Sequence, residues 1–197
     1  MLALVVVAHP SSESYCHALA TRAEVGLRAA GHDVVVLDLY AQGIRPAMSA
    51  DERRAYHGDE PIVDPLVAEH AELVQRAEAL VFVYPTWWSG LPAILKGWLE
   101  RVMVPGVGFV LDERTNKVRP GLRQMRRLVG ISTYGSPRPY VRLVNDNGRR
   151  IVTRALRMSC GLRVRTSWLG LYAIDTATPG ERQAFLARVE QQMADLR

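Results

Sequence analysis

The sequence predicts a doubly wound α/β fold, in which a five-stranded parallel β-sheet carries helices on both faces. Two observations predict it. Five short apolar runs, rich in β-branched residues, alternate with longer segments whose apolar residues recur at helical spacing. The runs are continuous rather than alternating, which is typical of strands buried on both faces. We find no internal repeat and no linker, so residues 1–197 are expected to form a single domain.

The composition indicates a soluble globular protein, with 48% hydrophobic and 23% charged residues. No apolar run reaches the roughly 18 to 20 residues of a membrane-spanning helix, and the first residues lack the basic segment of a signal peptide. We therefore expect a cytoplasmic protein without direct membrane insertion. Cys16 and Cys160 are too few for a disulfide framework and show no metal-ligand spacing, so we expect buried thiols and no metal.

The chain begins with a strand at residues 2–7, a helix at residues 15–30 and a second strand at residues 32–39. Gly31 ends the helix at the position where a left-handed residue is favoured. A parallel pair needs a crossover of this size, so these elements form one right-handed βαβ unit.

The turn after the first strand lacks both the G-x-G-x-x-G of dinucleotide-binding proteins and the phosphate loop of nucleotide hydrolases. It instead brings an imidazole and hydroxyl groups to a helix N-terminus, where free N–H groups and the helix dipole favour a phosphate. These side chains are His9, Ser11, Ser12 and Ser14. Serines also cap helices without any ligand, so both interpretations stay open.

The central stretch is a strand at residues 80–84, ended by Pro85, and an amphipathic helix from Leu91 with Ser89 as its expected N-cap. Between them, Trp87 and Trp88 lie in a turn that cannot easily bury them. The two indoles therefore need a partner, either a flat ligand or another subunit.

The remaining segments complete the alternating pattern. Residues 40–61 are a long connection that can carry a lid or a subunit contact, with a short helix opening at Ser49. The expected elements that follow are a helix at 63–77, a small hairpin or an irregular excursion at 109–118, a strand at 127–132, a helix at 140–157, an edge strand at 162–172 and a final helix that starts with a capping box at 178–181.

Positive charge is concentrated in the last two-fifths of the chain. Residues 119–165 contain twelve arginines and one acidic residue, Asp146, whereas the whole chain has a net charge of +5. The arginines alternate with core residues instead of forming a basic tail, so we expect no nucleic-acid partner. A phosphorylated cofactor and plain solvated arginine faces both remain possible.

Three unusual turns follow strands of the predicted sheet, at residues 9–14, 85–90 and 133–137. In an open parallel sheet, ligands bind beyond the carboxyl ends of the strands. A phosphate over the first turn, a flat ring beside the tryptophans and polar groups from the third turn describe a bound flavin. The alternative is that these are ordinary loops.

Four runs of residues make the chain similar to a known family. They are AHPSSESYCHAL, YPTWWSGLPAILKGWLERV, STYGSP and ATPGERQAFLARV. The sequence resembles the flavodoxin-like NAD(P)H dehydrogenase (quinone) family, which includes quinone reductases, modulators of drug activity and ancillary oxidoreductases of potassium-efflux systems. The resemblance covers nearly the whole chain except residues 40–62, and it implies the strand order 2-1-3-4-5.

The resemblance also implies site residues. His9, Ser14 and Tyr15 match the turn that holds the flavin phosphate. The loop that lines the isoalloxazine corresponds to Pro85, Thr86, Trp87 and Trp88. Thr133 and Gly135 match the turn at the pyrimidine edge, and Tyr140 matches a catalytic tyrosine that hydrogen-bonds the flavin or the acceptor.

Two positions depart from the family pattern. Cys16 stands where relatives often have asparagine, and Asp146 stands where quinone reductases of animal type have a histidine that pairs with the tyrosine. A tyrosine–histidine relay is therefore not expected here.

The resemblance implies a non-covalent flavin, FAD or FMN, and hydride transfer from NAD(P)H to a quinone-like acceptor by a ping-pong mechanism. It implies a homodimer as well. Arg138 and Arg142 are candidate partners for a nicotinamide 2′-phosphate. Two alternatives are an ancillary subunit of a membrane transporter and a flavodoxin-type electron-transfer module, although such carriers are typically acidic and this chain is basic.

Overall fold

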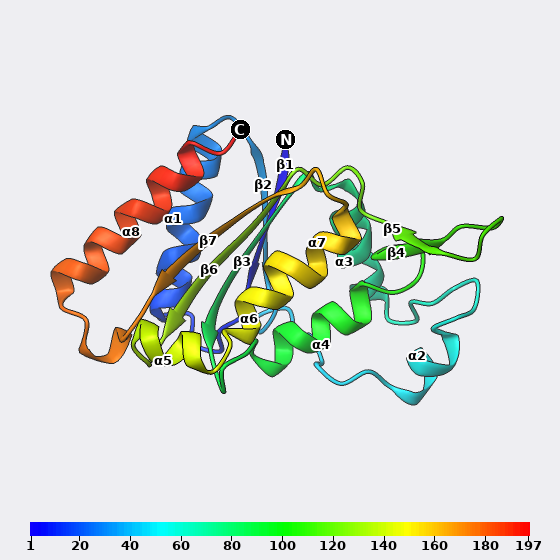
Figure 1. Cartoon of the computed structure of the whole chain (residues 1–197), viewed down its shortest axis with the longest axis horizontal. Helices are drawn as coiled ribbons and strands as arrows, with labels where there is room; N and C mark the ends of the chain where they lie inside the picture. Colours follow the sequence, from blue (N-terminus) through cyan, green and yellow to red (C-terminus); the bar gives the residue numbers. More distant parts are fainter.

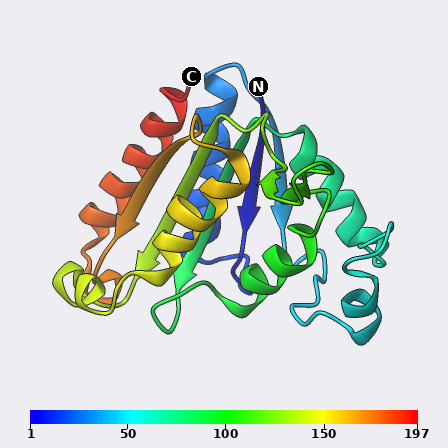
Figure 2. The ribbon, with the colours of Figure 1, turned by 45° about the vertical axis from the view of Figure 1, so that its right-hand side comes forward.

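The computed structural model describes all residues from 1 to 197, and its centre is a five-stranded parallel sheet (Figure 1). The strand order is β2-β1-β3-β6-β7, and every neighbouring pair is parallel. The strands are β1 (Leu2–Val7), β2 (Asp33–Asp38), β3 (Ala79–Thr86), β6 (Arg127–Tyr134) and β7 (Arg165–Leu171). This confirms the predicted fold class and the order 2-1-3-4-5, with the last strand at an edge. The arrowheads of all five strands point the same way in Figure 2, so their carboxyl ends share one edge.

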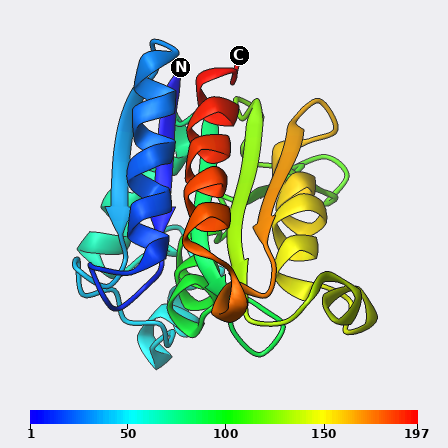
Figure 3. The same cartoon turned by 90° about the vertical axis from the view of Figure 1, so that its left-hand side faces the viewer.

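Helices cover both faces of the sheet. On one face, α1 (Tyr15–Ala29) and α8 (Pro179–Ala194) lie side by side (Figure 3). The other face carries α3 (Pro65–Arg76), α4 (Ala93–Val102) and a helical segment made of α6 (Asn147–Arg150), η1 (Ile151–Ala155) and α7 (Leu156–Cys160). Three shorter helices, α2 (Ala50–Ala55), α5 (Arg138–Leu143) and η2 (Ile174–Thr176), lie in the connections. A separate hairpin pairs β4 (Phe109–Leu111) with β5 (Val118–Pro120), which confirms the predicted hairpin.

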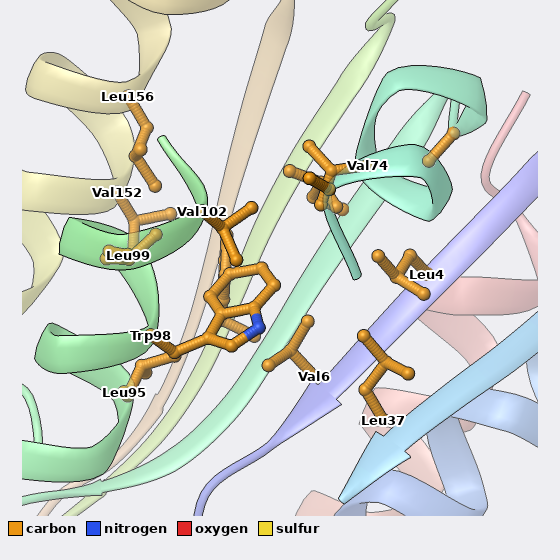
Figure 4. Packing of buried hydrophobic residues seen from close by; sticks show 14 of the residues in the cluster. Leu4, Val6, Leu37, Val74, Leu95, Trp98, Leu99, Val102, Val152 and Leu156 are labelled. Atoms are coloured by element: carbon orange, nitrogen blue, oxygen red, sulfur yellow. The ribbon is translucent and has the colours of Figure 1, made fainter. Parts of the chain in front are cut away.

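The sheet separates two hydrophobic clusters, because successive side chains of a buried strand point to opposite faces. Leu4 and Val6 of β1 belong to the cluster beneath α3 and α4, whereas Val5 and Val7 belong to the cluster beneath α1 and α8. Figure 4 shows the indole of Trp98 extending from α4 towards Val6. This indole is fully buried, and its Nε1 donates a hydrogen bond of 2.9 Å to Nδ1 of His70. Burial lowers the pKa of His70, which therefore stays neutral as an acceptor.

Two strands extend further than the sequence predicts. Pro85 pairs with Thr133 and Thr86 pairs with Tyr134, so the last residues of β3 and β6 are strand residues rather than turn residues. The sequence pattern predicts that the strand ends at Pro85. Hydrogen bonds with the neighbouring parallel strand, which the pattern does not reveal, extend it through Thr86.

Two helix boundaries were predicted wrongly. The helix expected at 140–157 is broken, because Asn145 and Asp146 adopt left-handed backbone angles, with φ of 77° and 43°. Asparagine and aspartate are the side chains that tolerate this conformation best. Ser89 is not the N-cap of α4, since it is itself left-handed with φ of 58°, and Pro92 takes the N-cap position.

The long connection between β2 and α3 is fixed to α4 by a buried ion cluster. Arg101 of α4 is 2% exposed, and its guanidinium donates to Glu52 Oε1 at 2.6 Å and to Asp64 Oδ2 at 2.6 Å. It also donates to the carbonyl oxygen of Arg45 at 2.8 Å. The short helix predicted here is confirmed as α2, and its capping box joins Ser49 and Glu52.

Candidate functional site

The three unusual turns meet at the carboxyl edge of the sheet, as their positions after parallel strands predict. Ala8 N–H, just beyond β1, donates to the carbonyl oxygen of Val83 in β3 at 3.0 Å. The ring centroids of His9 and Trp87 are 5.9 Å apart. Cys16 Sγ lies 3.9 Å from Thr133 Oγ1, which joins the start of α1 to the end of β6. Residues from all three turns therefore surround one region.

The first turn presents donors at the start of a long helix. Ser14 is the N-cap of α1, and its Oγ accepts a hydrogen bond from His17 N–H at 3.3 Å. His9 Nδ1 lies 3.1 Å from the backbone nitrogen of Ser11 and 3.2 Å from its carbonyl oxygen, so the imidazole is fixed within this turn. Backbone N–H groups, the helix dipole and an imidazole donor are the groups that bind phosphate.

A histidine and an aspartate that the sequence did not indicate support this turn. His17 Nδ1 lies 2.9 Å from Ser14 Oγ, and His17 Nε2 lies 2.8 Å from Asp38 Oδ2 at the end of β2. Burial opposes ionisation of Asp38, but hydrogen bonds from His17 and from the backbone N–H groups of Ala41 and Tyr40 outweigh it and lower its pKa. Only the serine–histidine spacing of three residues could have signalled this chain of contacts.

Tyr15 is oriented by the final helix. Its hydroxyl donates to the carbonyl oxygen of Arg182 in α8 at 2.6 Å. Burial raises the pKa of Tyr15 to about 12, so the phenol remains a donor. Tyr15 therefore lies between α1 and α8, beside the first turn.

The tryptophan turn is tight and exposes its indoles. Trp88 and Ser89 are consecutive left-handed residues, with φ of 48° and 58°, and Gly90 N–H donates to the carbonyl oxygen of Trp87 at 3.0 Å. Left-handed backbone is unfavourable for such residues and is often retained at binding sites. Trp88 is 103% exposed and Trp87 is 42% exposed. The indole of Trp88 thus has no partner within the chain.

A cleft of about 250 Å³ opens between the second and third turns. Its walls come from the tryptophan turn (Thr86, Trp88, Ser89), the end of β6 (Tyr134, Gly135, Ser136) and α5 with the following bend (Tyr140, Val141, Val144, Asp146). Of the predicted site residues, those that line the cleft are Thr86, Trp88, Gly135 and Tyr140. The others lie outside its walls, either at the first turn (His9, Ser14, Tyr15) or in and beside the ends of β3 and β6 (Pro85, Trp87, Thr133).

The tyrosine that forms a hydrogen bond in this cleft is Tyr134 rather than Tyr140. Its hydroxyl donates to Asp146 Oδ1 at 3.0 Å, and its ring stacks on Tyr172 with centroids 4.5 Å apart. Burial, together with the nearby carboxylate, raises the pKa of Tyr134 well above its usual value, so this phenol stays protonated. Tyr140 is 51% exposed and has no hydrogen-bond partner for its hydroxyl. The parallel pairing of β6 with β3, which single-sequence patterns do not encode, is what places Tyr134 here.

The two cysteines lie in the core, and the chain contains no cluster of metal-ligating side chains. Both cysteines are free and buried, and burial raises the pKa of Cys16 to about 11 and that of Cys160 to about 12. No group of three or more His, Cys, Asp or Glu side chains could hold a metal ion. No helix combines the length and the apolar character that crossing a bilayer would require.

Comparison with known proteins finds a matching family model and several related proteins. The family model described as flavodoxin-like fold, Flavodoxin_2, matches residues 1–196. The uncharacterized NAD(P)H oxidoreductase of Haemophilus influenzae is 31% identical over 134 residues, which are 68% of this chain and 64% of that protein. NAD(P)H dehydrogenase (quinone) 1 of Rattus norvegicus is 30% identical over 153 residues, which are 70% of this chain and 55% of that protein. The match thus spans between about half and two-thirds of the length of these relatives.

Among solved structures, the NAD(P)H:quinone oxidoreductase of Methanothermobacter marburgensis superposes with a TM-score of 0.82 at 26% sequence identity. The superposition covers 100% of this chain and 99% of that one. The similarity extends over every strand and helix that builds the cleft.

Proposed function

Because this chain belongs to the flavodoxin-like fold family, we propose that it is a flavin-dependent oxidoreductase that uses NAD(P)H to reduce quinones or similar acceptors. One observation carries the proposal. A helix N-terminus with free N–H groups, an exposed indole without a partner and a polar cleft lie at one edge of the sheet. This arrangement supports binding of a molecule with a phosphate at one end and a flat ring at the other. FMN has this shape, and FAD contains the same unit with an adenosine monophosphate joined to its phosphate.

The first turn would hold the phosphate. The free N–H groups of the first turn of α1 and the His9 imidazole would bind the phosphate, while Ser14 caps the helix and contacts His17. The only acidic residue in the same turn is Glu13, which is exposed. Tyr15, fixed against α8, borders this subsite. The helix dipole adds a favourable field for the anion.

The second and third turns would hold the ring. Thr86 and Trp88 of the second turn and Gly135 of the third, which line the cleft, would contact the ring. Pro85, Trp87 and Thr133 would border it from the ends of β3 and β6. When bound, the flavin supplies hydride chemistry between NAD(P)H and the acceptor, in a ping-pong sequence. Backbone N–H groups of the second turn would stabilise negative charge on a ring bound there.

Tyr140 and Tyr134 have different roles in this proposal. Tyr140, exposed at the mouth of the cleft, would donate a hydrogen bond to the ring or to the acceptor. Tyr134 instead fixes Asp146, because its hydroxyl donates to that carboxylate and its ring is held by Tyr172. Tyr134 is thus a positioning residue, and Asp146 provides a fixed acceptor in the cleft wall.

A homodimer is part of the proposal. The fully exposed indole of Trp88 stands at the rim of the cleft, and a second subunit would both cover it and exclude water from the site. We expect the purified protein to sediment as a dimer, and a stable monomer with full activity would contradict this part of the proposal.

Rapid mixing tests the function directly. The purified protein should be yellow, and heat release followed by mass analysis should identify FMN or FAD. Adding NADPH or NADH without oxygen should bleach the visible flavin absorbance within seconds, and a benzoquinone should then restore it. A protein that is reduced by one-electron donors but by neither nicotinamide would instead be an electron-transfer module, and a colourless protein that cannot be loaded with flavin would overturn the proposal.

A further inference from the structure

A second cavity, of about 490 Å³, adjoins the cleft and lies between the α6–α7 segment and the edge strand β7. Figure 3 shows this segment beside β7 at the border of the sheet. Five arginines line the cavity, namely Arg142, Arg149, Arg150, Arg154 and Arg157. We call it the arginine cavity. Its only acidic residue is Asp146, and its floor includes the hydroxyl residues Thr166 and Ser167.

The charges in the arginine cavity are not neutralised within the chain. None of its five arginines forms an ion pair, whereas seven arginines elsewhere, such as Arg22 and Arg119, lie within 4.0 Å of a carboxylate. One oxygen of Asp146 already accepts the hydrogen bond from Tyr134. Like charges gathered in a concave site repel one another and focus a positive potential. Such a site is stabilised by a bound anion.

The wall is rich in hydrogen-bond donors. Its five guanidinium groups can each bind phosphate oxygens in pairs of hydrogen bonds. Arg157 and Trp168, which also line the cavity, each keep a buried nitrogen, Nε and Nε1, without a hydrogen-bond partner. The cavity therefore offers many donors and few acceptors, which suits a ligand rich in acceptor oxygens.

Two backbone irregularities lie in the wall of the arginine cavity. Asn145 and Asp146 end α5 with left-handed angles, and the chain restarts as a helix at once. The helix then passes through a π-helical turn, Ile151–Ala155, a feature that is frequent at functional sites.

The arginine cavity and the cleft share one wall residue, Asp146. A ligand whose flat ring enters the cleft can therefore extend its charged end into the cavity. We propose that the arginine cavity binds the phosphorylated adenosine end of NADPH, so that this protein uses NADPH in preference to NADH. This inference rests on the proposed function. The cavity would distinguish NADPH from NADH by the 2′-phosphate, which only NADPH carries.

The two arginines proposed from the sequence as partners of the 2′-phosphate line different cavities. Arg142 lines the arginine cavity, whereas the guanidinium carbon of Arg138 lies 5.9 Å from the centroid of the Tyr172 ring, in the neighbouring cavity. Arginines also protect exposed edge strands from pairing with other chains. Edge protection requires neither a cavity nor buried donors without acceptors, so it does not account for this arrangement.

Calorimetry on the flavin-loaded protein tests the site independently of turnover. Adenosine 2′,5′-bisphosphate should bind at least about tenfold more tightly than adenosine 5′-monophosphate, the gain expected for one added charge-assisted phosphate contact. Arg154→Gln should remove most of this gain. Arg163→Gln is the matched control, because Arg163 is exposed in the same basic region but lies outside the cavity.

Reduction kinetics provide the second readout. NADPH should have a higher kcat/KM than NADH, and Arg154→Gln should lower the value for NADPH by a larger factor than that for NADH, whereas Arg163→Gln should leave the ratio of the two values as in the wild type. Equal use of both donors, with no preference for the bisphosphate, would overturn the inference and leave the proposed function standing. If pyrophosphate displaces the bisphosphate fully at equal concentration, the cavity is a general anion site and the assignment to NADPH is wrong. Failure of both donors to bleach the flavin would refute the proposed function instead, while calorimetry still reports on the cavity.

Discussion

Replacing Ser14 by aspartate is expected to leave the protein folded but unable to retain its flavin. Aspartate caps helices as well as serine does, so α1 keeps its N-cap and its favourable interaction with the dipole. The new carboxylate, however, lies where the proposed phosphate binds. Two unit charges ~4 Å apart interact by about 4 kcal/mol at an effective dielectric constant of 20. Flavin affinity should therefore fall by about 100-fold or more.

The measurement compares flavin content and thermal unfolding of the same preparations. Thr21→Asp is the control, since Thr21 is exposed on α1 seven residues after the N-cap and the substitution adds the same charge outside the first turn. We expect Thr21→Asp to keep its flavin and Ser14→Asp to be colourless with an unfolding temperature close to that of the flavin-free wild-type protein. A yellow Ser14→Asp protein with one flavin per chain would show that the phosphate lies elsewhere.

The fold and the edge that carries the site follow from local features of the sequence. Strands buried on both faces are continuous apolar runs, and the run at residues 80–84 is bounded by Pro85 and an amphipathic helix. In a parallel sheet the loops after the strands share one edge, so His9, Trp87 and Thr133 could be placed together before any coordinates were known. The structure brings them together in this way.

The parts that could not be predicted depend on contacts between distant segments. The bond between Tyr134 and Asp146 requires the break in the helix at Asn145, and a helical pattern of apolar residues continues through that break without a signal. No sequence pattern singles out His17, because its contact with Asp38 depends on how β2 lies beside β1. The arginine cavity likewise requires the edge strand and the α6–α7 segment to be brought together.

Removing the guanidinium of Arg101 is expected to cause the largest loss of stability of any single substitution considered for this chain. Arg101→Met keeps an unbranched side chain of similar length but leaves the carboxylates of Glu52 and Asp64 without their partner. Breaking a buried ion pair in this way costs about 3–5 kcal/mol. The control is Arg126→Met, because the Arg126–Glu78 pair is exposed and such pairs contribute about 1 kcal/mol or less.

The pH dependence separates a lost ion pair from lost packing. Hydrogen bonds from Arg101 are the main cause of the lowered pKa of Asp64. Burial alone would raise the pKa of Glu52, but hydrogen bonds from Ser49 and Arg101 outweigh the burial and lower this pKa as well. A carboxyl group with a lowered pKa stabilises the fold above its unfolded pKa, about 3.9 for Asp and 4.3 for Glu, and this contribution is lost as the pH falls through the folded pKa. Denaturant unfolding at neutral pH should therefore show the full difference between wild type and Arg101→Met, and the difference should shrink below about pH 4. A difference that stays constant across this range would mean that the arginine contributes through its packing and not through its charge, since packing against neighbouring side chains does not titrate.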